Sequence, residues 1–354
     1  MERREKLIGG INLSSAVCAE IGALCNPVLK KTEANVVYVD YADAETLRKH
    51  YSGNPSVYPD RIVETDAIWG DQTLSVALKK PVDFIVASHV VEHVPDLVAW
   101  LNELHSALTE GGEVRLAVPD RRFTFDFLRR ETELSDVLAA YLTSPRVPQP
   151  VAILDYFLNA TEVDAAAAWR GEVTASNLRR SDTFDAAMAT ARDSLERGVY
   201  HDAHCWVFTP QSFAILLSQL SARGLINFAC DKFHDTERDS IEFFVAMRVS
   251  DDRDQNARSW ELMASAARDF NPKMSKGPEA FEPWYELKEL DAGDMQNALR
   301  EEKKRSALFL AELHDAQAAL ARSRADVDLL RRSTSWKLTQ PLRWLSMTLK
   351  GQRI

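Results

Sequence analysis

The sequence has few cysteines, and none of them is spaced as in a disulfide or metal-binding framework. No Cys-x-x-Cys pair occurs among the four cysteines in 354 residues. They stand in apolar or strand-like surroundings, so we expect reduced, buried thiols, as in proteins of a reducing compartment. The four positions are Cys18, Cys25, Cys205 and Cys230.

Long apolar runs are also missing. No stretch of about 18 or more consecutive apolar residues occurs, so we expect no membrane-spanning helix. The opening residues, MERREKLIGG, carry charge but no apolar segment of signal-peptide length. We therefore expect a cytoplasmic protein.

Acidic residues outnumber basic ones outside the C-terminal segment. The formal net charge is −10, which argues against nucleic acid as a general partner because phosphate binding needs a basic face. No acidic residue follows Asp328, whereas six basic residues do. The end of the chain therefore differs in kind from the rest.

Short apolar runs alternate with helical patterns over residues 16–120, which predicts a parallel, doubly wound α/β sheet. A closing hairpin near residues 226–249 would bring the sheet to seven strands. We expect strands at 16–24, 35–42, 61–70, 82–90, 113–120, 226–236 and 240–249. We expect helices at 43–51, 95–112 and 209–225, with a helical insertion at about 121–200 that is interrupted by a proline-rich loop at 144–150.

Beyond a domain that spans residues 1–249, the pattern changes. Residues 250–290 are polar and proline-broken, as in a linker with some helix. Leucines spaced three and four apart at 291–332 suggest a helix or short coiled coil, a segment for self-association or a partner. The tail at 333–354 interleaves tryptophans with cations, which fits an amphipathic helix on an anionic membrane surface, or one docked on protein.

The stretch AEIGALCNP, residues 19–27, predicts a strand that ends in a sharp turn. Glycine at position 22 would let the backbone approach a ligand closely. Leu24 and Asn26 stand where further glycines are common in such turns. Because asparagine tolerates a left-handed backbone, we expect Asn26 to replace one glycine, whereas Leu24 has no such explanation.

Acidic residues end the next two predicted strands. Asp40 follows Glu20 by 20 residues, the place and spacing of a carboxylate that binds the ribose hydroxyls of an adenosine cofactor. The alternative is an aspartate that caps the following helix. Asp66, with Ala67 and Ile68, follows the third strand.

The stretch SHVVEHVPD, residues 88–96, allows two interpretations. His89-Val90-Val91-Glu92-His93 matches H-x-x-E-H, a zinc-protease signature. A zinc site needs both histidines on an established helix, but Pro95 places them across a strand end and a helix start. We therefore favour a loop at the edge of a cofactor site and expect no metal here or in HDAHC, residues 201–205.

Together these motifs resemble the class I S-adenosylmethionine-dependent methyltransferases over residues 16–249, including GGEVRLAVPD at 111–120 and HDAHCWVFTPQSF at 201–213. The resemblance implies S-adenosylmethionine as cofactor, with Glu20 beneath it and Asp66, Ala67 and Ile68 around the adenine. It also implies that Ser88 and His89 lie near the transferred methyl group, with Glu92 and His93 shaping the loop.

The residues of these motifs resemble those of small bacterial methyltransferases that are encoded together with enzymes of cell-surface polysaccharide biosynthesis. This implies a sugar or glycan-precursor acceptor. The stretch SWKLTQPLR, residues 335–343, resembles a tail of bacterial cell-surface glycosyltransferases, which implies a glycosyltransferase partner or a place at the inner face of the membrane.

A hydroxyl acceptor needs a nearby base, and four residues are candidates: His89, Asp120, His201 and His204. Arg121, Arg122 and Tyr156 are candidates for binding acceptor hydroxyls or phosphate. Two alternatives to the enzyme remain. One is a methyltransferase-like scaffold that acts through its coiled coil, and the other is a zinc hydrolase that uses HVVEH.

Overall fold

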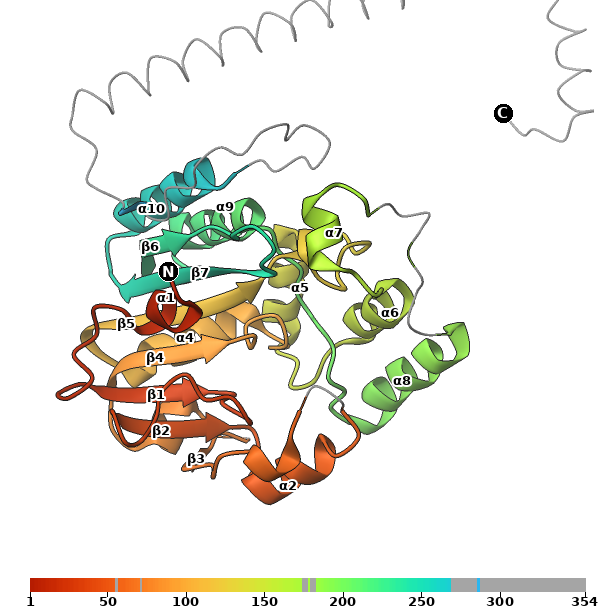
Figure 1. Ribbon diagram of the computed structural model, residues 1–354, viewed down its shortest axis with the longest axis horizontal. Coiled ribbons are helices and arrows are strands. Elements are labelled where there is room, and N and C mark those ends of the chain that lie inside the picture. Colours follow the sequence, from red (N-terminus) through yellow and green to blue (C-terminus); the bar gives the residue numbers. More distant parts are fainter. Residues whose placement is uncertain (55–56, 71, 174–177, 179–182, 269–284, 287–354) are drawn as a thin grey trace, which may run out of the picture. The chain divides into compact units, whose positions relative to one another are not determined.

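A mixed sheet with helices on both faces forms the centre of the protein (Figure 1). The computed structural model describes residues 1–54, 57–70, 72–173, 178, 183–268 and 285–286. The strands are β1 (Val17–Ile21), β2 (Asn35–Asp40), β3 (Ala67–Ile68), β4 (Val82–Ser88), β5 (Leu108–Pro119), β6 (Phe228–His234), β7 (Glu242–Val249) and β8 (Tyr285–Glu286).

The helices fall into a group around the sheet and a group between β5 and β6. The first group is α1 (Arg3–Ile8), α2 (Ala44–His50), α3 (Leu74–Leu78), α4 (Leu97–Ala107) and α10 (Arg253–Ala266). The second is α5 (Leu134–Thr143), α6 (Pro150–Asn159), α7 (Ala165–Trp169), α8 (Phe184–Arg197) and α9 (Pro210–Ala222). Short 3-10 turns occupy Pro59–Arg61 and Arg121–Phe123.

The strand order is β3-β2-β1-β4-β5-β7-β6-β8. The order confirms the doubly wound sheet of seven strands, to which the two-residue β8 adds an edge. β7 runs antiparallel to both β5 and β6, and the pairs among β1 to β5 are parallel. The chain reverses its direction of travel between β1 and β4, and such a switch point is where open α/β sheets bind ligands.

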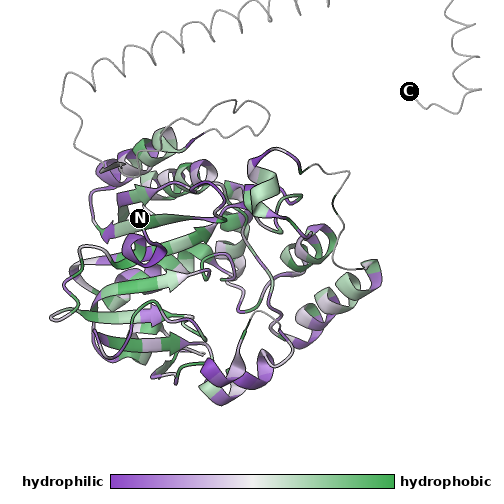
Figure 2. Ribbon diagram, viewed as in Figure 1, coloured by the Kyte–Doolittle hydropathy of each residue, from purple (hydrophilic) through white to green (hydrophobic). Residues whose placement is uncertain are grey.

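The core follows the two-residue period of the strands. Ile85 and Ala87 of β4 face a cluster that includes α4, α9 and α10, whereas Val86 between them faces a cluster that includes α1. The central strands are therefore apolar on both faces (Figure 2), as expected of a sheet covered on both sides.

The largest differences from the predicted element bounds concern the helix after β4 and the third strand. The helix predicted at 95–112 is shorter, because Asp96 caps α4 and the chain is already extended from Leu108, so that β5 runs through the two glycines predicted to stop the helix. The third strand keeps only Ala67–Ile68. The proline-rich stretch at 144–150 connects α5 to α6, and Thr209 caps α9, both as predicted.

The folded unit extends past Val249, the predicted domain end. α10 packs on α9 and β6, and its Trp260 is fully buried with Nε1 donating to the Phe228 carbonyl. α10 is polar in composition but contains a few strongly buried side chains. The composition of this segment therefore placed the end of the domain too early, at Val249.

The predicted coiled coil at 291–332 and the tail at 333–354 lie outside the described residues. No helix within the described ranges has both the length and the apolar character needed to cross a membrane. All four cysteines are free thiols, and three of them are buried, as expected.

Candidate functional site

A cavity of about 1340 Å³ opens at the carboxyl ends of β1, β2 and β4, at the switch point. Ile21 and Gly22 line it after β1, Asp40 and Tyr41 after β2, and His89 after β4. The opposite wall comes from α6 and from the segment that follows α8. Ligand cavities typically measure about 300–1,000 Å³, so this one has room for more than one small molecule.

Glu20 stabilises the loop after β1 through hydrogen bonds to its backbone. Its carboxylate is 2% exposed and accepts the backbone N–H of Val28 at 2.7 Å and of Leu29 at 2.8 Å. Burial raises the pKa of Glu20 to about 7, against the lowering effect of these two bonds. Glu20 does not line the cavity, so its contribution to the site is the shape of the loop.

Gly22 and Leu24 give the turn its left-handed positions. Gly22 has φ +69°, and a Cβ there would meet Cγ2 of Val90 at 2.9 Å, so the turn lies too close to the β4 loop for a side chain. Leu24 also has positive φ, at 43°, whereas Asn26 does not. Our assignment of the left-handed backbone to Asn26 was therefore wrong. Asn26 lies outside the cavity lining, and Leu24 lines it.

Asp40 stands at the end of β2 and lines the cavity. Its Oδ1 accepts the N–H of Tyr41 at 2.8 Å, and burial raises its pKa to about 6. Asp43 is the residue that caps α2, so the helix-cap alternative for Asp40 does not apply. This carboxylate is therefore available to a ligand.

Asp66, Ala67 and Ile68 do not line the cavity. The Asp66 carboxylate accepts the backbone N–H of Tyr38 at 2.9 Å and pairs with Lys31 at 2.6 Å. The next residues, Trp69 and Gly70, do line the cavity. Sequence reasoning missed Trp69, because the strand predicted at 61–70 is only Ala67–Ile68 and the chain has already left the strand at Trp69.

His89 lines the cavity in a left-handed conformation, with φ 55°. Its Nε2 lies 2.8 Å from Glu242 of β7, which also pairs with Arg3 of α1. Burial alone would lower the pKa of His89, but the hydrogen bond to Glu242 and the negative charge of the nearby Glu92 raise it to about 9. Ser88, which accepts from Arg3, is not in the lining.

Glu92 and His93 lie in the same loop and face His204, which arrives from the segment after α8. The ligand atoms of these three residues lie within 4.8 Å of one another. Glu92 is fully buried, and neither of its oxygens has a hydrogen-bond partner. The protease arrangement of H-x-x-E-H does not form, since His89 turns its Nε2 to Glu242 instead.

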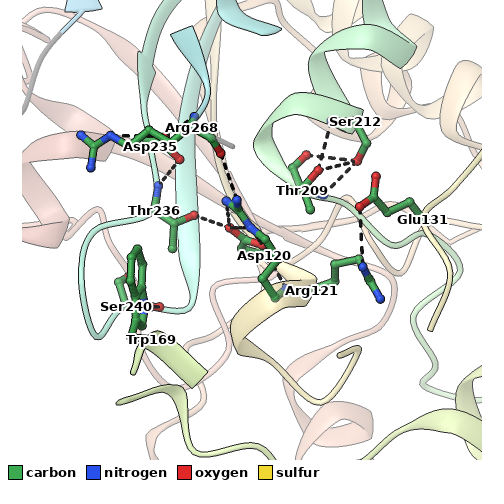
Figure 3. Close-up of polar contacts among 11 residues, drawn as sticks. Asp120, Arg121, Glu131, Trp169, Thr209, Ser212, Asp235, Thr236, Ser240 and Arg268 are labelled. Atoms are coloured by element: carbon green, nitrogen blue, oxygen red, sulfur yellow. Dashed lines mark hydrogen bonds and ion pairs between the residues drawn. The ribbon is translucent and has the colours of Figure 1, made fainter. Parts of the chain in front are cut away.

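The remaining predicted residues divide between the cavity and the protein interior. Asp120 is fully buried, and its carboxylate accepts hydrogen bonds from the Arg122 guanidinium. It also accepts from the Thr236 hydroxyl at 2.7 Å (Figure 3). Asp120 therefore stabilises the turn after β5 and does not line the cavity. His201 pairs with Asp193 at 2.8 Å and is also outside the lining.

The two candidate arginines are also engaged elsewhere. Arg121 donates to the Phe127 carbonyl and pairs with Glu131 (Figure 3). Arg122 pairs with Asp120, and neither arginine lines the cavity. Tyr156 of α6 does line it, with its ring 5.7 Å from that of His204.

The methyltransferase domain family matches residues 17–220, more than half of the chain. The chain belongs to this family and is an S-adenosylmethionine-dependent methyltransferase of the α/β class, as the motifs predicted. A search of curated proteins gave no match.

Solved structures with some likeness are also methyltransferases. Magnesium protoporphyrin IX methyltransferase from Synechocystis PCC 6803 with bound SAM is 10% identical over 70% of this chain and 76% of that one, with TM-score 0.30. The CcbJ methyltransferase from Streptomyces caelestis is 10% identical over 70% and 94%, with TM-score 0.36. The CurJ carbon methyltransferase is 11% identical over 69% of this chain, with TM-score 0.33, and the match spans about half (51%) of that protein.

Proposed function

We propose that the protein transfers the methyl group of S-adenosylmethionine to a hydroxyl of a sugar or glycan precursor bound in the switch-point cavity. The observation that carries the proposal is that one cavity joins the Gly22–Asp40 edge to a wall of histidine and aromatic side chains. Its volume exceeds what one small ligand needs.

The residues at the strand ends fit the cofactor. The missing side chain of Gly22 leaves room against Val90, and the Asp40 carboxylate can accept the two ribose hydroxyls. Tyr41 follows directly, with its ring 5.5 Å from that of Tyr200 on the opposite wall. When bound, S-adenosylmethionine supplies an electrophilic methyl carbon on a sulfonium. The task of the protein is to align an acceptor with that carbon.

The opposite wall fits a hydroxyl acceptor. Tyr156 and Phe125 offer aromatic faces beside His204, with the Phe125 ring 4.7 Å from that of His204. Of the four candidate bases, only His89 and His204 line the cavity. With a pKa of about 9, His89 is protonated at neutral pH and cannot accept a proton. His204 directs Nδ1 to Asp126 at 2.6 Å and keeps Nε2 toward the cavity cluster.

The choice of a glycan acceptor rests on the resemblance of the motifs to polysaccharide-associated methyltransferases. The leucine spacing of residues 291–332 supports a role in self-association or in binding a glycosyltransferase. The tryptophans and cations of residues 333–354 support docking at an anionic membrane surface. Both remain predictions.

Calorimetric titration with S-adenosylmethionine tests the cofactor half. We expect micromolar binding by the wild type, weakened roughly 10–100-fold in Asp40→Ala because charge-assisted hydrogen bonds to the ribose are lost. Asp43→Asn is the matched control, since Asp43 only caps α2 and should leave affinity unchanged.

Turnover tests the acceptor half. We expect S-adenosylhomocysteine to form with a sugar nucleotide or glycan precursor present. Cofactor binding without turnover on any sugar would favour the scaffold alternative, and absence of cofactor binding would overturn the proposal.

A further inference from the structure

Glu92 is an ionisable side chain buried without hydrogen-bond partners. It is 0% exposed, and both carboxylate oxygens lack a hydrogen bond. Leaving such a group unpaired is costly, and native proteins pair most buried polar atoms. A carboxylate kept in this condition beside a cavity indicates a ligand that supplies the missing contact.

Three histidines present a nitrogen to this carboxylate. Nδ1 of His89 lies 3.4 Å from Oε1 of Glu92 without hydrogen-bond geometry, and the Nε2 of His89 is already bonded to Glu242. Nε2 of His93 and Nε2 of His204 each lie 3.9 Å from Oε1 of Glu92. These distances are too long for hydrogen bonds. Glu92, His93 and His204 therefore surround a common point without bonding to one another.

The other ring nitrogen of each histidine faces a carboxylate. Nδ1 of His204 is hydrogen-bonded to Asp126 at 2.6 Å, whereas Nδ1 of His93 lies 2.9 Å from Asp202 as an ion pair without hydrogen-bond geometry. An imidazole nitrogen that faces a carboxylate carries the proton, which leaves Nε2 as an electron-pair donor. Metal-binding histidines commonly have this second contact, which sets the tautomer and the ring direction.

We propose that Glu92, His93 and His204 bind a divalent first-row transition ion with its open positions toward the cavity. Two imidazoles and one carboxylate are the ligand set of catalytic zinc and of related ions, whereas magnesium prefers oxygen ligands alone. Bond lengths near 2.1 Å require the three donors to close by several tenths of an ångström from their present positions.

The ion would also act in the proposed methyl transfer, and this part rests on the proposed function. An acceptor hydroxyl at an open position would lose its proton more readily, as metal-bound water does. The proton passes to water in the cavity. The acceptor oxygen then bonds to the methyl carbon, while the carbon–sulfur bond breaks and its electron pair stays on sulfur. His204 would serve as a ligand in this scheme rather than as the base.

The test uses the full chain without a histidine tag, stripped with a chelator and then titrated with Co²⁺. We expect one equivalent to bind with visible absorption typical of a protein-bound ion, and Zn²⁺ to displace it. Glu92→Gln and His93→Gln should each weaken binding by at least about 100-fold, since loss of even an outer partner costs about 10–100-fold. His201→Gln is the matched control, because that histidine faces Asp193 outside the cavity, and it should leave binding unchanged.

A wild type that binds none of Co²⁺, Zn²⁺ or Mn²⁺ at micromolar concentration would overturn the metal site, whatever the variants do. Equal loss in His201→Gln would overturn the assigned ligands. S-adenosylmethionine binding, measured separately, distinguishes the two proposals. If the protein binds cofactor and turns over fully in chelator, the metal proposal is overturned and the methyltransferase proposal stands. If it binds the ion but not the cofactor, the methyltransferase proposal is overturned and the metal site stands.

Discussion

Glu20 and Glu92 are both buried glutamates near the carboxyl edge of the sheet, and their surroundings are opposite. Glu20 accepts two backbone N–H groups. Glu92 accepts none, and its nearest polar neighbours are imidazole nitrogens at 3.4 to 3.9 Å. Burial alone would raise the pKa of Glu92, but the nearby histidines lower it. The contrast separates a carboxylate that maintains a loop from one that is ready for a ligand.

Matched glutamine substitutions test this contrast directly. Glu20→Gln should reduce the free energy of unfolding by about 2–4 kcal/mol, because its amide NH2 would face a backbone N–H and leave it buried without an acceptor. Glu92→Gln should reduce the stability of the metal-free protein by less than Glu20→Gln does, because the lost attraction to the histidines is offset by the removed cost of burying a charge, and no hydrogen bond is lost. Urea unfolding followed by circular dichroism in chelator measures both. Similar losses in the two variants would contradict the distinction.

The Asp40 carboxylate sharpens the comparison through pH. Burial raises its pKa from 3.8 to about 6, and the ribose hydroxyls would donate to the ionised form. Cofactor affinity should therefore be highest above about pH 7, where Asp40 is ionised. It should fall as the pH drops through 6 and be about tenfold weaker at pH 5.

The same group has the opposite effect on the stability of the unliganded protein. A folded pKa above the unfolded value means that the folded state binds more protons between pH 4 and 6, so this contribution to stability grows as pH falls. Calorimetry at pH 5 and 7 on wild type and Asp40→Asn separates the two effects. An unchanged pH profile in Asp40→Asn would assign the titration to another group.

Leu24 offers the smallest effect. Leu24→Gly would relieve a left-handed backbone, worth about 1 kcal/mol, and would lose a partly buried side chain of similar worth. We expect stability within about 1 kcal/mol of wild type and cofactor affinity within about threefold. Leu24→Val is the control, because a β-branched residue tolerates positive φ poorly and should be less stable than both. A large gain in cofactor affinity from glycine would mean that leucine impairs the loop.

Local pattern was sufficient for the sheet and for some residues at its edge, but not for Asp66, Ala67, Ile68 and Ser88, which lie outside the cavity lining. Gly22 and Asp40 follow apolar strands directly, so their place at the cavity could be predicted from periodicity and strand ends. The left-handed backbone was predicted at Asn26 but occurs at Leu24. Residue propensity favours asparagine in a left-handed turn, and it takes no account of the packing of the Leu24 side chain against the cluster that includes Leu47 and Ile62.

The cluster at Glu92 could not be predicted in the same way. Sequence reasoning placed Glu92 and His93 together in the loop and His204 among the candidate bases, because His204 is distant in the chain and reaches the loop only through tertiary packing. Cys205 and Trp206 donate their N–H groups to the Glu92 carbonyl and so bring His204 into place. No local pattern reports such a contact.

The reversed direction of β7 has a consequence for redesign. In an all-parallel sheet only strand ends reach the ligand edge, but β7 enters at that edge with its first residue, Glu242, which contacts His89. The charge of the β4 loop can therefore be tuned from a side chain at the start of β7, outside the β4 loop itself. Engineers could vary Glu242 to adjust the preference for charged or neutral acceptors while leaving every loop of the cavity as it is.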